Sequence, residues 1–217
     1  MNKLVLSTKE ELKENLEVLE ITGEKTELRL FGEIEVDSIL FPTMEFETTW
    51  ILEENADVKI CIAQEICNLK GKIHLISNEN AHLVFHFGML AKERNELEIL
   101  HEQVKNNAEC EMKIRIVTSE NSKVFLKATG VIAKGTHGNV YLEDIKYLNE
   151  YPGSIVCLPE LFVESDDTEA NHNMTVSGID DETLFHLESR GIDRYHAKEL
   201  ISKSFVESMS RKDRDYL

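Results

Sequence analysis

The sequence predicts a mainly β protein that ends in two helices. From residue 18 to about residue 163, short runs that alternate apolar and polar residues recur, and Gly or Asn turns separate many of them. No helical pattern interrupts these runs, which argues against βαβ units. Many short strands in succession are typical of a sandwich, a jelly roll or a β-solenoid, and the alternation does not separate these folds. No repeat of fixed length is evident, which counts mildly against a solenoid.

The first 17 residues are predicted to form a short helix that caps the strand region. Thr8 and Glu11 have the spacing of a capping box, in which each side chain bonds to the backbone of the other residue. Leu12 and Leu16 follow at the interval that places side chains on one face of a helix. We expect this helix to cover the next element of the fold, with no functional site of its own.

Composition and charge narrow the functional classes. The chain has 217 residues, 41% hydrophobic and 30% charged, which is typical of a folded domain with a real core. Its net charge of −17 argues against nucleic acid, because phosphate contacts need clustered Lys and Arg. No apolar run approaches the roughly 20 residues of a membrane helix, and the N-terminal apolar run is too short for a signal peptide. We therefore expect a cytoplasmic protein that binds neither nucleic acid nor membrane.

The stretch from Leu158 to Phe205 carries the most specific pattern. A strand-like run from residue 161 to 164 ends at Asp166 and Asp167, and a polar connector that contains His172 is predicted to follow. Two amphipathic helices come next. Asp180 is the candidate N-cap of the first helix, which ends at Gly191. The second helix follows Asp193 and has an apolar stripe of Ala197, Leu200, Ile201 and Phe205.

This stretch resembles the C-terminal end of the SufB/SufD family, the non-ATPase subunits of the SUF iron–sulfur cluster assembly machine. The family pattern is a proline, a leucine-rich strand, an Asp-Asp pair, a central His, an ATVG segment, an acidic helix start and L-x-S-R-G-I before the last helix. The matching residues here are Pro159, Leu161, Asp166, Asp167, His172, Thr175, Val176, Ile179, Asp180, Leu184, Phe185, Leu187, Ser189, Arg190, Gly191, Ile192, Ala197 and Phe205. A weaker likeness extends back to Gly130, and the chain looks like a short, core-only member.

The resemblance implies a right-handed parallel β-helix with a helical C-terminal segment. Residues 1–17 are then the N-terminal helical cap, residues 18–165 the SufBD-like β-helix core, and residues 166–217 a connector plus helices that dock an ATPase. An open strand edge near Leu161 is an aggregation hazard unless a second subunit covers it. In the family, SufB and SufD pair at this edge, so we expect a homodimer or a heterodimer with another SufB/SufD-type subunit.

His172 and Cys157 are the candidate cofactor-binding and metal-ligating residues. His172 matches the connector histidine of the family, although Asn173 follows it where SufB-like chains have Glu and SufD-like chains have Gly. Cys157 lies near the family's cluster-linked cysteine, which falls close to Gly153 here. Thiolate and neutral imidazole both bind iron. The resemblance implies a transient iron–sulfur cluster, and these departures leave a SufB-like and a SufD-like role open.

Three functions follow from these patterns. The first is a non-enzymatic scaffold or scaffold partner that assembles iron–sulfur clusters together with a SufC-like ABC-type ATPase. The second is an adaptor that binds the ATPase and holds no cluster. The third is a metal-binding β-barrel enzyme that uses His82 and His86, which share one face of a predicted strand; an exposed polar face is the interpretation we favour for this pair. No P-loop, GxSxG, HExxH or Rossmann glycine pattern is present, so we predict no enzyme.

Overall fold

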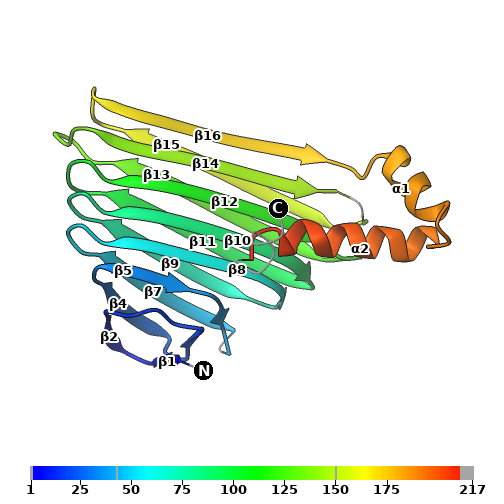
Figure 1. Ribbon diagram of the computed structural model, residues 1–217, viewed down its shortest axis with the longest axis horizontal. Helices are drawn as coiled ribbons and strands as arrows, with labels where there is room; N and C mark the ends of the chain where they lie inside the picture. The colour runs from blue at the N-terminus through cyan, green and yellow to red at the C-terminus, as the bar shows by residue number, and fades with distance from the viewer. Residues whose placement is uncertain (1, 43, 150, 211–217) are drawn as a thin grey trace.

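The computed structural model describes residues 2–42, 44–149 and 151–210. The chain winds as a parallel β-solenoid and ends in two helices, which confirms the fold class that the family resemblance implies (Figure 1). Successive long strands alternate between two main sheets, so each turn of the chain adds one strand to each of the two sheets. We call one such turn a rung. Because no rung can bury its own apolar face, stacking of the rungs supplies the core.

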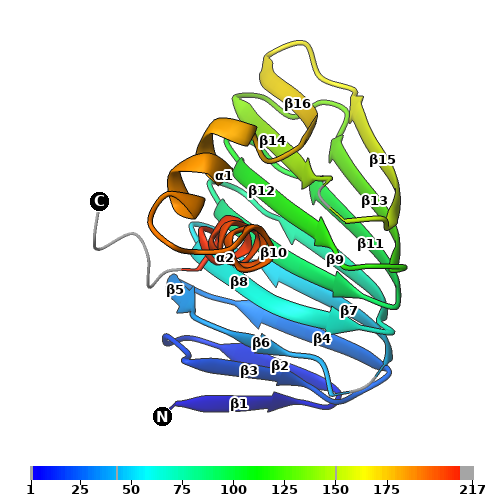
Figure 2. The ribbon, with the colours of Figure 1, turned by 90° about the vertical axis from the view of Figure 1, so that its right-hand side faces the viewer.

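The strands form three sheets among the described residues. The six-stranded sheet contains, in spatial order, β16 (Thr168–Ser177), β14 (Asn139–Leu148), β12 (Glu109–Thr118), β10 (His82–Lys92), β8 (Asp57–Cys67) and β5 (Glu33–Val36). The seven-stranded sheet contains β15 (Ser154–Val163), β13 (Lys123–Ile132), β11 (Arg94–Gln103), β9 (Lys70–Ser77), β7 (Glu45–Leu52), β4 (Lys25–Leu30) and β2 (Lys9–Leu12). A small sheet at the N-terminal end contains β1 (Lys3–Leu6), β3 (Val18–Ile21) and β6 (Ile39–Leu40) (Figure 2).

The length of a turn varies along the solenoid. Thr26 stacks on Thr48, 22 residues later, whereas the backbone of Ala108 bonds to Asn139, 31 residues later. A constant feature marks one corner of the middle rungs: Asn55, Asn80 and Asn107 all have positive φ angles. Their side chains form a ladder, in which Asn80 Nδ2 donates to Asn55 Oδ1 over 2.9 Å and Asn107 Nδ2 donates to Asn80 Oδ1 over 3.1 Å. The turns are therefore stacked in register although their lengths differ.

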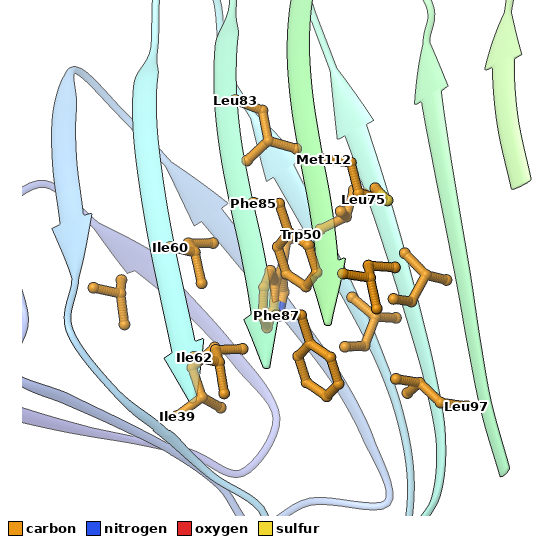
Figure 3. Packing of buried hydrophobic residues seen from close by; sticks show 14 of the residues in the cluster. Ile39, Trp50, Ile60, Ile62, Leu75, Leu83, Phe85, Phe87, Leu97 and Met112 are labelled. Carbon is orange, nitrogen blue, oxygen red and sulfur yellow. The ribbon is translucent and has the colours of Figure 1, made fainter. Parts of the chain in front are cut away.

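The core fills the space between the two main sheets. Trp50, Phe85 and Phe87 are fully buried there, and ring centroids lie 6.3 Å apart both between Trp50 and Phe85 and between Phe85 and Phe87 (Figure 3). On the outward faces, lysines, arginines and carboxylates pair between rungs, as in the Arg29–Glu53 bridge. Such exposed pairs add little each, so buried apolar area carries most of the stability.

The predicted N-terminal helix is wrong. Residues 1–17 contain two strands, β1 and β2, and the solenoid therefore begins at Lys3. β2 pairs with β4, and Leu6 and Leu12 are buried in the core. The capping-box spacing of Thr8 and Glu11 is a weak local preference, which the burial of leucines against the next rung overrides.

The predicted connector after Asp167 is also wrong. Residues 168–177 form β16, which pairs with β14 over ten residues and is the last strand of the six-stranded sheet. The solenoid thus extends to Ser177 instead of ending at residue 165. No further rung stacks on β16 within the described residues, so polar side chains on this strand stay in contact with solvent and carry no desolvation cost. The strand can therefore contain a polar run that resembles a loop in the sequence: Asn171, His172 and Asn173.

Both C-terminal helices lie where the sequence predicts them. α1 (Asp181–Glu188) begins after the N-cap Asp180, whose side chain accepts from the backbone N–H of Thr183, and the chain turns at Gly191 with φ +87°. α2 (Arg194–Glu207) begins after the N-cap Asp193. Neither helix is long and apolar enough to span a membrane, which holds for every helix in the described residues.

α2 covers the outer face of the six-stranded sheet, at the ends of β8, β10 and β12 (Figure 2). Gly88 permits the contact, because a Cβ there would lie 2.3 Å from the carbonyl oxygen of Val206. The predicted apolar stripe is correct for Ala197, which is buried, and for Ile201 and Phe205, which pack against buried residues, but Leu200 is exposed. The sheet, and not α1 alone, is therefore the main partner of this helix.

Candidate functional site

The last turn of the solenoid, β15 and β16, forms an open end that we call the terminal rung. Both strands are the outermost members of their sheets in the described residues. The rung exposes several large apolar side chains, each with 43% to 57% of its surface accessible: Val156, Leu158, Phe162, Val163 and Val176. Apolar patches of this kind, on unpaired strand edges, mark interaction surfaces.

Cys157 lies on β15 and faces the inside of the solenoid. Its partner in the neighbouring strand is the buried Leu126, and its side chain packs against the core together with Ile155 and Leu161. The thiol is free and half-buried. Burial, and secondly the Glu143 carboxylate, raise the pKa of Cys157 to about 11. The predicted cysteine is thus accessible from the open end. Its thiol stays protonated until a metal ion displaces the proton or a base removes it.

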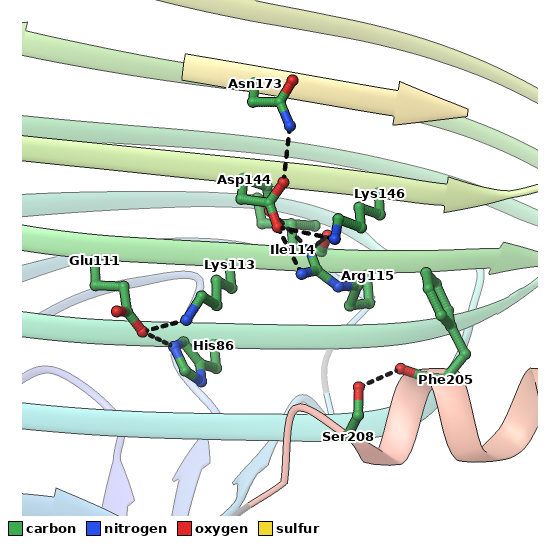
Figure 4. Close-up of polar contacts among 10 residues, drawn as sticks. All are labelled: His86, Glu111, Lys113, Ile114, Arg115, Asp144, Lys146, Asn173, Phe205 and Ser208. Atoms are coloured by element: carbon green, nitrogen blue, oxygen red, sulfur yellow. Dashed lines mark hydrogen bonds and ion pairs between the residues drawn. The ribbon is translucent and has the colours of Figure 1, made fainter. Parts of the chain in front are cut away.

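His172 also faces the inside, from β16. Ala170 and Met174 of this strand pack against the core. His172 lies two residues from each of them, so its side chain shares their face of the sheet. Asn173 points the other way, and its Nδ2 donates to Asp144 Oδ1 on the outer face over 3.1 Å (Figure 4). His172 is exposed because nothing described stacks beyond it. It is therefore an inward residue of the solenoid that the open end leaves accessible.

Glu143 lies directly behind His172, one rung earlier. It is 3% exposed, and the Tyr141 hydroxyl donates to its Oε2 over 2.9 Å. Its Oε1 is buried with no hydrogen-bond partner in the described residues. Burial raises the pKa of Glu143 to about 7. The sequence contains a signal for this residue that the sequence-based prediction missed, since Glu143 occupies an inward position of the alternating run Asn139–Leu148.

The terminal rung therefore brings both predicted ligands to one end of the solenoid. Cys157 comes from the seven-stranded sheet and His172 from the six-stranded sheet, and β15 and β16 contact each other. No group of three or more His, Cys, Asp and Glu side chains in the described ranges is close enough to hold a metal ion. The two predicted residues belong to one surface without forming a complete ligand set within it.

His82 and His86 do not form a metal pair. They share one face of β10 as predicted, but each binds a carboxylate. His82 Nδ1 lies 2.9 Å from Asp57 Oδ1, and His86 Nε2 lies 2.6 Å from Glu111 Oε1 (Figure 4). His86 is buried, contrary to the expected exposed polar face. Since the fold is also a solenoid and not a barrel, the β-barrel enzyme is excluded.

The C-terminal helices present a second surface. A groove of about 820 Å³ lies between α2 and the strand ends, where Leu90, Tyr151 and Leu200 contribute apolar surface. Tyr195 and Phe185 are more than 60% exposed nearby. Arg194 is used within the molecule, because it pairs with Asp181 and Glu188 of α1. The exposed aromatic and apolar side chains, more than that arginine, characterise this surface.

Comparison with known proteins gives the family. Residues 58–205, which run from β8 through the terminal rung and α1 into α2, match the SufBD core domain of the SUF system for FeS cluster assembly. The chain belongs to this family. It is 39% identical over 57 residues to the iron-sulfur cluster assembly protein SufD of Escherichia coli (strain K12), a match that covers 26% of this chain and 14% of SufD.

Two further SufBD relatives show matches of similar extent. SufD of Plasmodium falciparum is 38% identical over 63 residues, which cover 29% of this chain and 4% of that protein. A SufBD family protein of Staphylococcus saprophyticus is 32% identical over 79 residues, which cover 36% of this chain and 17% of that protein. The matched segments thus span less than a fifth of each of these three relatives.

Proposed function

We propose that the chain is a non-enzymatic cytoplasmic subunit of an iron–sulfur cluster assembly complex, and that its terminal rung is the assembly site. The observation that supports this most is the position of Cys157 and His172, which both face inward at the open end of the solenoid. Thiolate and imidazole are the ligand types that iron–sulfur centres use. Iron and sulfide are cargo here, held transiently and passed on.

A second SufBD-type subunit completes the site in this proposal. The open edges of β15 and β16 and their exposed apolar side chains favour pairing with another chain. Pairing places two sets of inward residues face to face, so that donors from both subunits surround one cluster. Either a second copy or a related subunit satisfies this geometry.

Anaerobic reconstitution with Fe²⁺ and sulfide tests the cluster site. We expect cluster absorbance for the unchanged protein, and its loss in Cys157→Ala and His172→Ala. Matched controls are Cys67→Ala, at an exposed cysteine on β8, and His82→Ala, at an accessible histidine on β10. Equal cluster retention in all four variants would show that the terminal rung holds no cluster.

The C-terminal helices dock an ABC-type ATPase in the same proposal. Tyr195 and Leu200 of α2 are exposed apolar side chains beside the groove. We expect Leu200→Glu together with Tyr195→Glu to abolish capture of a SufC-like ATPase, because an interface cannot bury unpaired charges cheaply. Leu40→Glu, at an equally accessible leucine on β6, is the control and retains capture. Unchanged capture by the double variant would place ATPase docking elsewhere.

One observation favours the alternative of an adaptor that holds no cluster. The Cys157 thiol resists ionisation, because burial and the nearby Glu143 carboxylate raise its pKa to about 11. An adaptor keeps ATPase capture and gives no cluster absorbance under any reconstitution condition. The two experiments above, performed on the same variants, separate the adaptor from the scaffold.

A further inference from the structure

The interior of the solenoid contains a carboxyl group with one unused oxygen. Glu143 is 3% exposed, and its Oε1 makes no hydrogen bond in the part of the chain that the structure describes. Buried polar atoms without partners are rare in folded proteins, and each one requires an explanation. The Glu143 side chain points toward the core between Tyr141 and Ile145, on the face that leads to the open end.

The residue directly beyond Glu143 is His172. The two are register partners in β14 and β16, and they share the inward face of the sheet. Neighbouring strands lie about 4.8 Å apart, so side chains of register partners on one face stack on each other. The same chain contains such a pair: His82 and Asp57 are register partners, and Nδ1 lies 2.9 Å from Oδ1. A carboxylate followed by a histidine on the next rung is therefore a contact that this solenoid accommodates.

We propose that Glu143 is a positioning residue for His172: rotation of the exposed His172 side chain lets Glu143 Oε1, which has no hydrogen-bond partner among the described residues, accept a hydrogen bond from one imidazole N–H. The bond fixes the tautomer and orientation of the ring, so that the lone pair of the other ring nitrogen is directed to the open end. Carboxylates orient metal-binding histidines in this way from behind the ligand shell. The part of the inference that concerns iron rests on the proposed assembly function, whereas the hydrogen bond itself does not.

The rungs behind Glu143 hold its carboxylate in place. Tyr141 donates to Oε2, which leaves Oε1 as the free acceptor. The Tyr141 ring fits because residue 130 on β13 is a glycine: a Cβ there would lie 2.5 Å from Tyr141 Cζ. Gly130, Tyr141, Glu143 and His172 thus form a series in which each member determines the position of the next.

The hydrogen bond is tested on the full-length protein without metal. Nitrogen-15 NMR of labelled histidines reports which ring nitrogen of His172 carries the proton, measured well above pH 7 so that Glu143 is ionised. We expect one tautomer to dominate in the wild type. In Glu143→Gln, the Tyr141 hydroxyl retains the amide oxygen and the NH₂ group is left for His172, so the tautomer ratio should shift toward the opposite form. An unchanged ratio overturns the proposal.

A matched control separates this effect from general perturbation. Asp57→Asn alters the equivalent pair at His82, so it should change the tautomer of His82 and leave that of His172 unchanged. Glu143→Gln should do the reverse. Thermal unfolding and circular dichroism identify any variant that fails to fold, and for such a variant Glu143→Asp, which keeps the charge, takes its place and should preserve the wild-type tautomer.

Iron binding provides the second measurement. Substitution of a residue that orients a metal ligand typically weakens metal affinity about 10-fold to 100-fold. We expect a loss of this size in anaerobic Fe²⁺ titration of Glu143→Gln and no loss in Asp57→Asn. A shifted tautomer with unchanged Fe²⁺ affinity overturns the positioning role in iron binding. If the wild type binds no iron at all, the assembly function fails, and the tautomer measurement still decides whether Glu143 holds His172.

Discussion

The central and terminal rungs of the solenoid both consist of long strands, but they differ in how many neighbouring strands cover them. Phe85 on β10 and Val163 on β15 both face the interior of the solenoid, yet Phe85 is fully buried and Val163 is 44% exposed. β10 has the neighbours β8 and β12, whereas β15 has only β13 among the described residues. In a stacked fold, burial is supplied by the next rung. The absence of a further rung beyond β15 and β16 in the described residues therefore leaves inward positions exposed.

Histidines show the same difference. His101, on β11 of the central rung, is fully buried and bonds to Ser77 Oγ over 2.8 Å. His172, on the terminal rung, faces the same interior but is exposed. The interior of the solenoid excludes water from His101, whereas the open end admits solvent, and in our proposal a cluster, to His172. Position along the stack, more than residue type, separates the structural histidine from the candidate ligand.

The largest expected difference concerns Phe85 and Val163. Phe85→Ala leaves a cavity between Trp50 and Phe87 and should lower the free energy of unfolding by about 3–5 kcal/mol. Val163→Ala shortens an inward side chain that the open end leaves 44% exposed, so we expect a loss of about 1 kcal/mol or less. Urea unfolding followed by circular dichroism measures both. Similar losses in the two variants would mean that the terminal rung is as tightly packed as the central rung.

Association should depend on the terminal rung and not on the opposite end of the solenoid. Val176→Lys on β16 places a charge in the proposed subunit interface, and we expect self-association or pairing with a related subunit to weaken about 100-fold, or about 2.8 kcal/mol. Val5→Lys on β1 is the control, because Val5 is similarly exposed at the N-terminal end. Analytical ultracentrifugation compares the two. Equal weakening, or a monomeric wild type, contradicts pairing through this rung.

The buried histidine should make stability depend on pH. Burial, and secondly the charge of His74, lower the pKa of His101 from the ordinary histidine value of 6.5 to about 3. Below pH 6.5 the unfolded state binds a proton at this histidine that the folded state does not bind, so the contribution of His101 to stability falls as pH falls. Between pH 7.5 and 5.5 the loss is about 1.4 kcal/mol. In denaturant unfolding, the wild type should lose about 1.4 kcal/mol more unfolding free energy over this pH range than His101→Gln does. The control His137→Gln, at an exposed histidine, should behave like the wild type.

The smallest expected effect concerns the corner that aligns the rungs. Asn80 has a positive φ of 54° and bonds to Asn55 and Asn107. Asn80→Ala retains the strained backbone without the ladder, and we expect a loss of about 1 kcal/mol in thermal unfolding. Asn80→Gly loses the same side-chain bonds without strain and should cost less. If the two variants have equal stability, the ladder matters and the left-handed conformation does not.

A repeat was present in the sequence, although no fixed period is evident. Asn-Ala pairs at Asn55, Asn80 and Asn107 each precede a strand of the six-stranded sheet. Their spacing varies because the turns between strands differ in length, so a search for one period fails where the alignment of a short corner motif succeeds. The solenoid is predicted from the family pattern after Leu158 and not from this corner motif.

The sequence by itself determined the strand-rich fold and the two C-terminal helices with their caps at Asp180 and Asp193. These features depend on local chemistry: alternation, capping oxygens and the glycine that ends a helix. Only the tertiary structure decided that residues 1–17 form strands, that His172 lies on a strand, and that Glu143 lies behind it. Each of these depends on which rung stacks on which, and stacking joins residues 15 to 31 positions apart, beyond the reach of any local pattern.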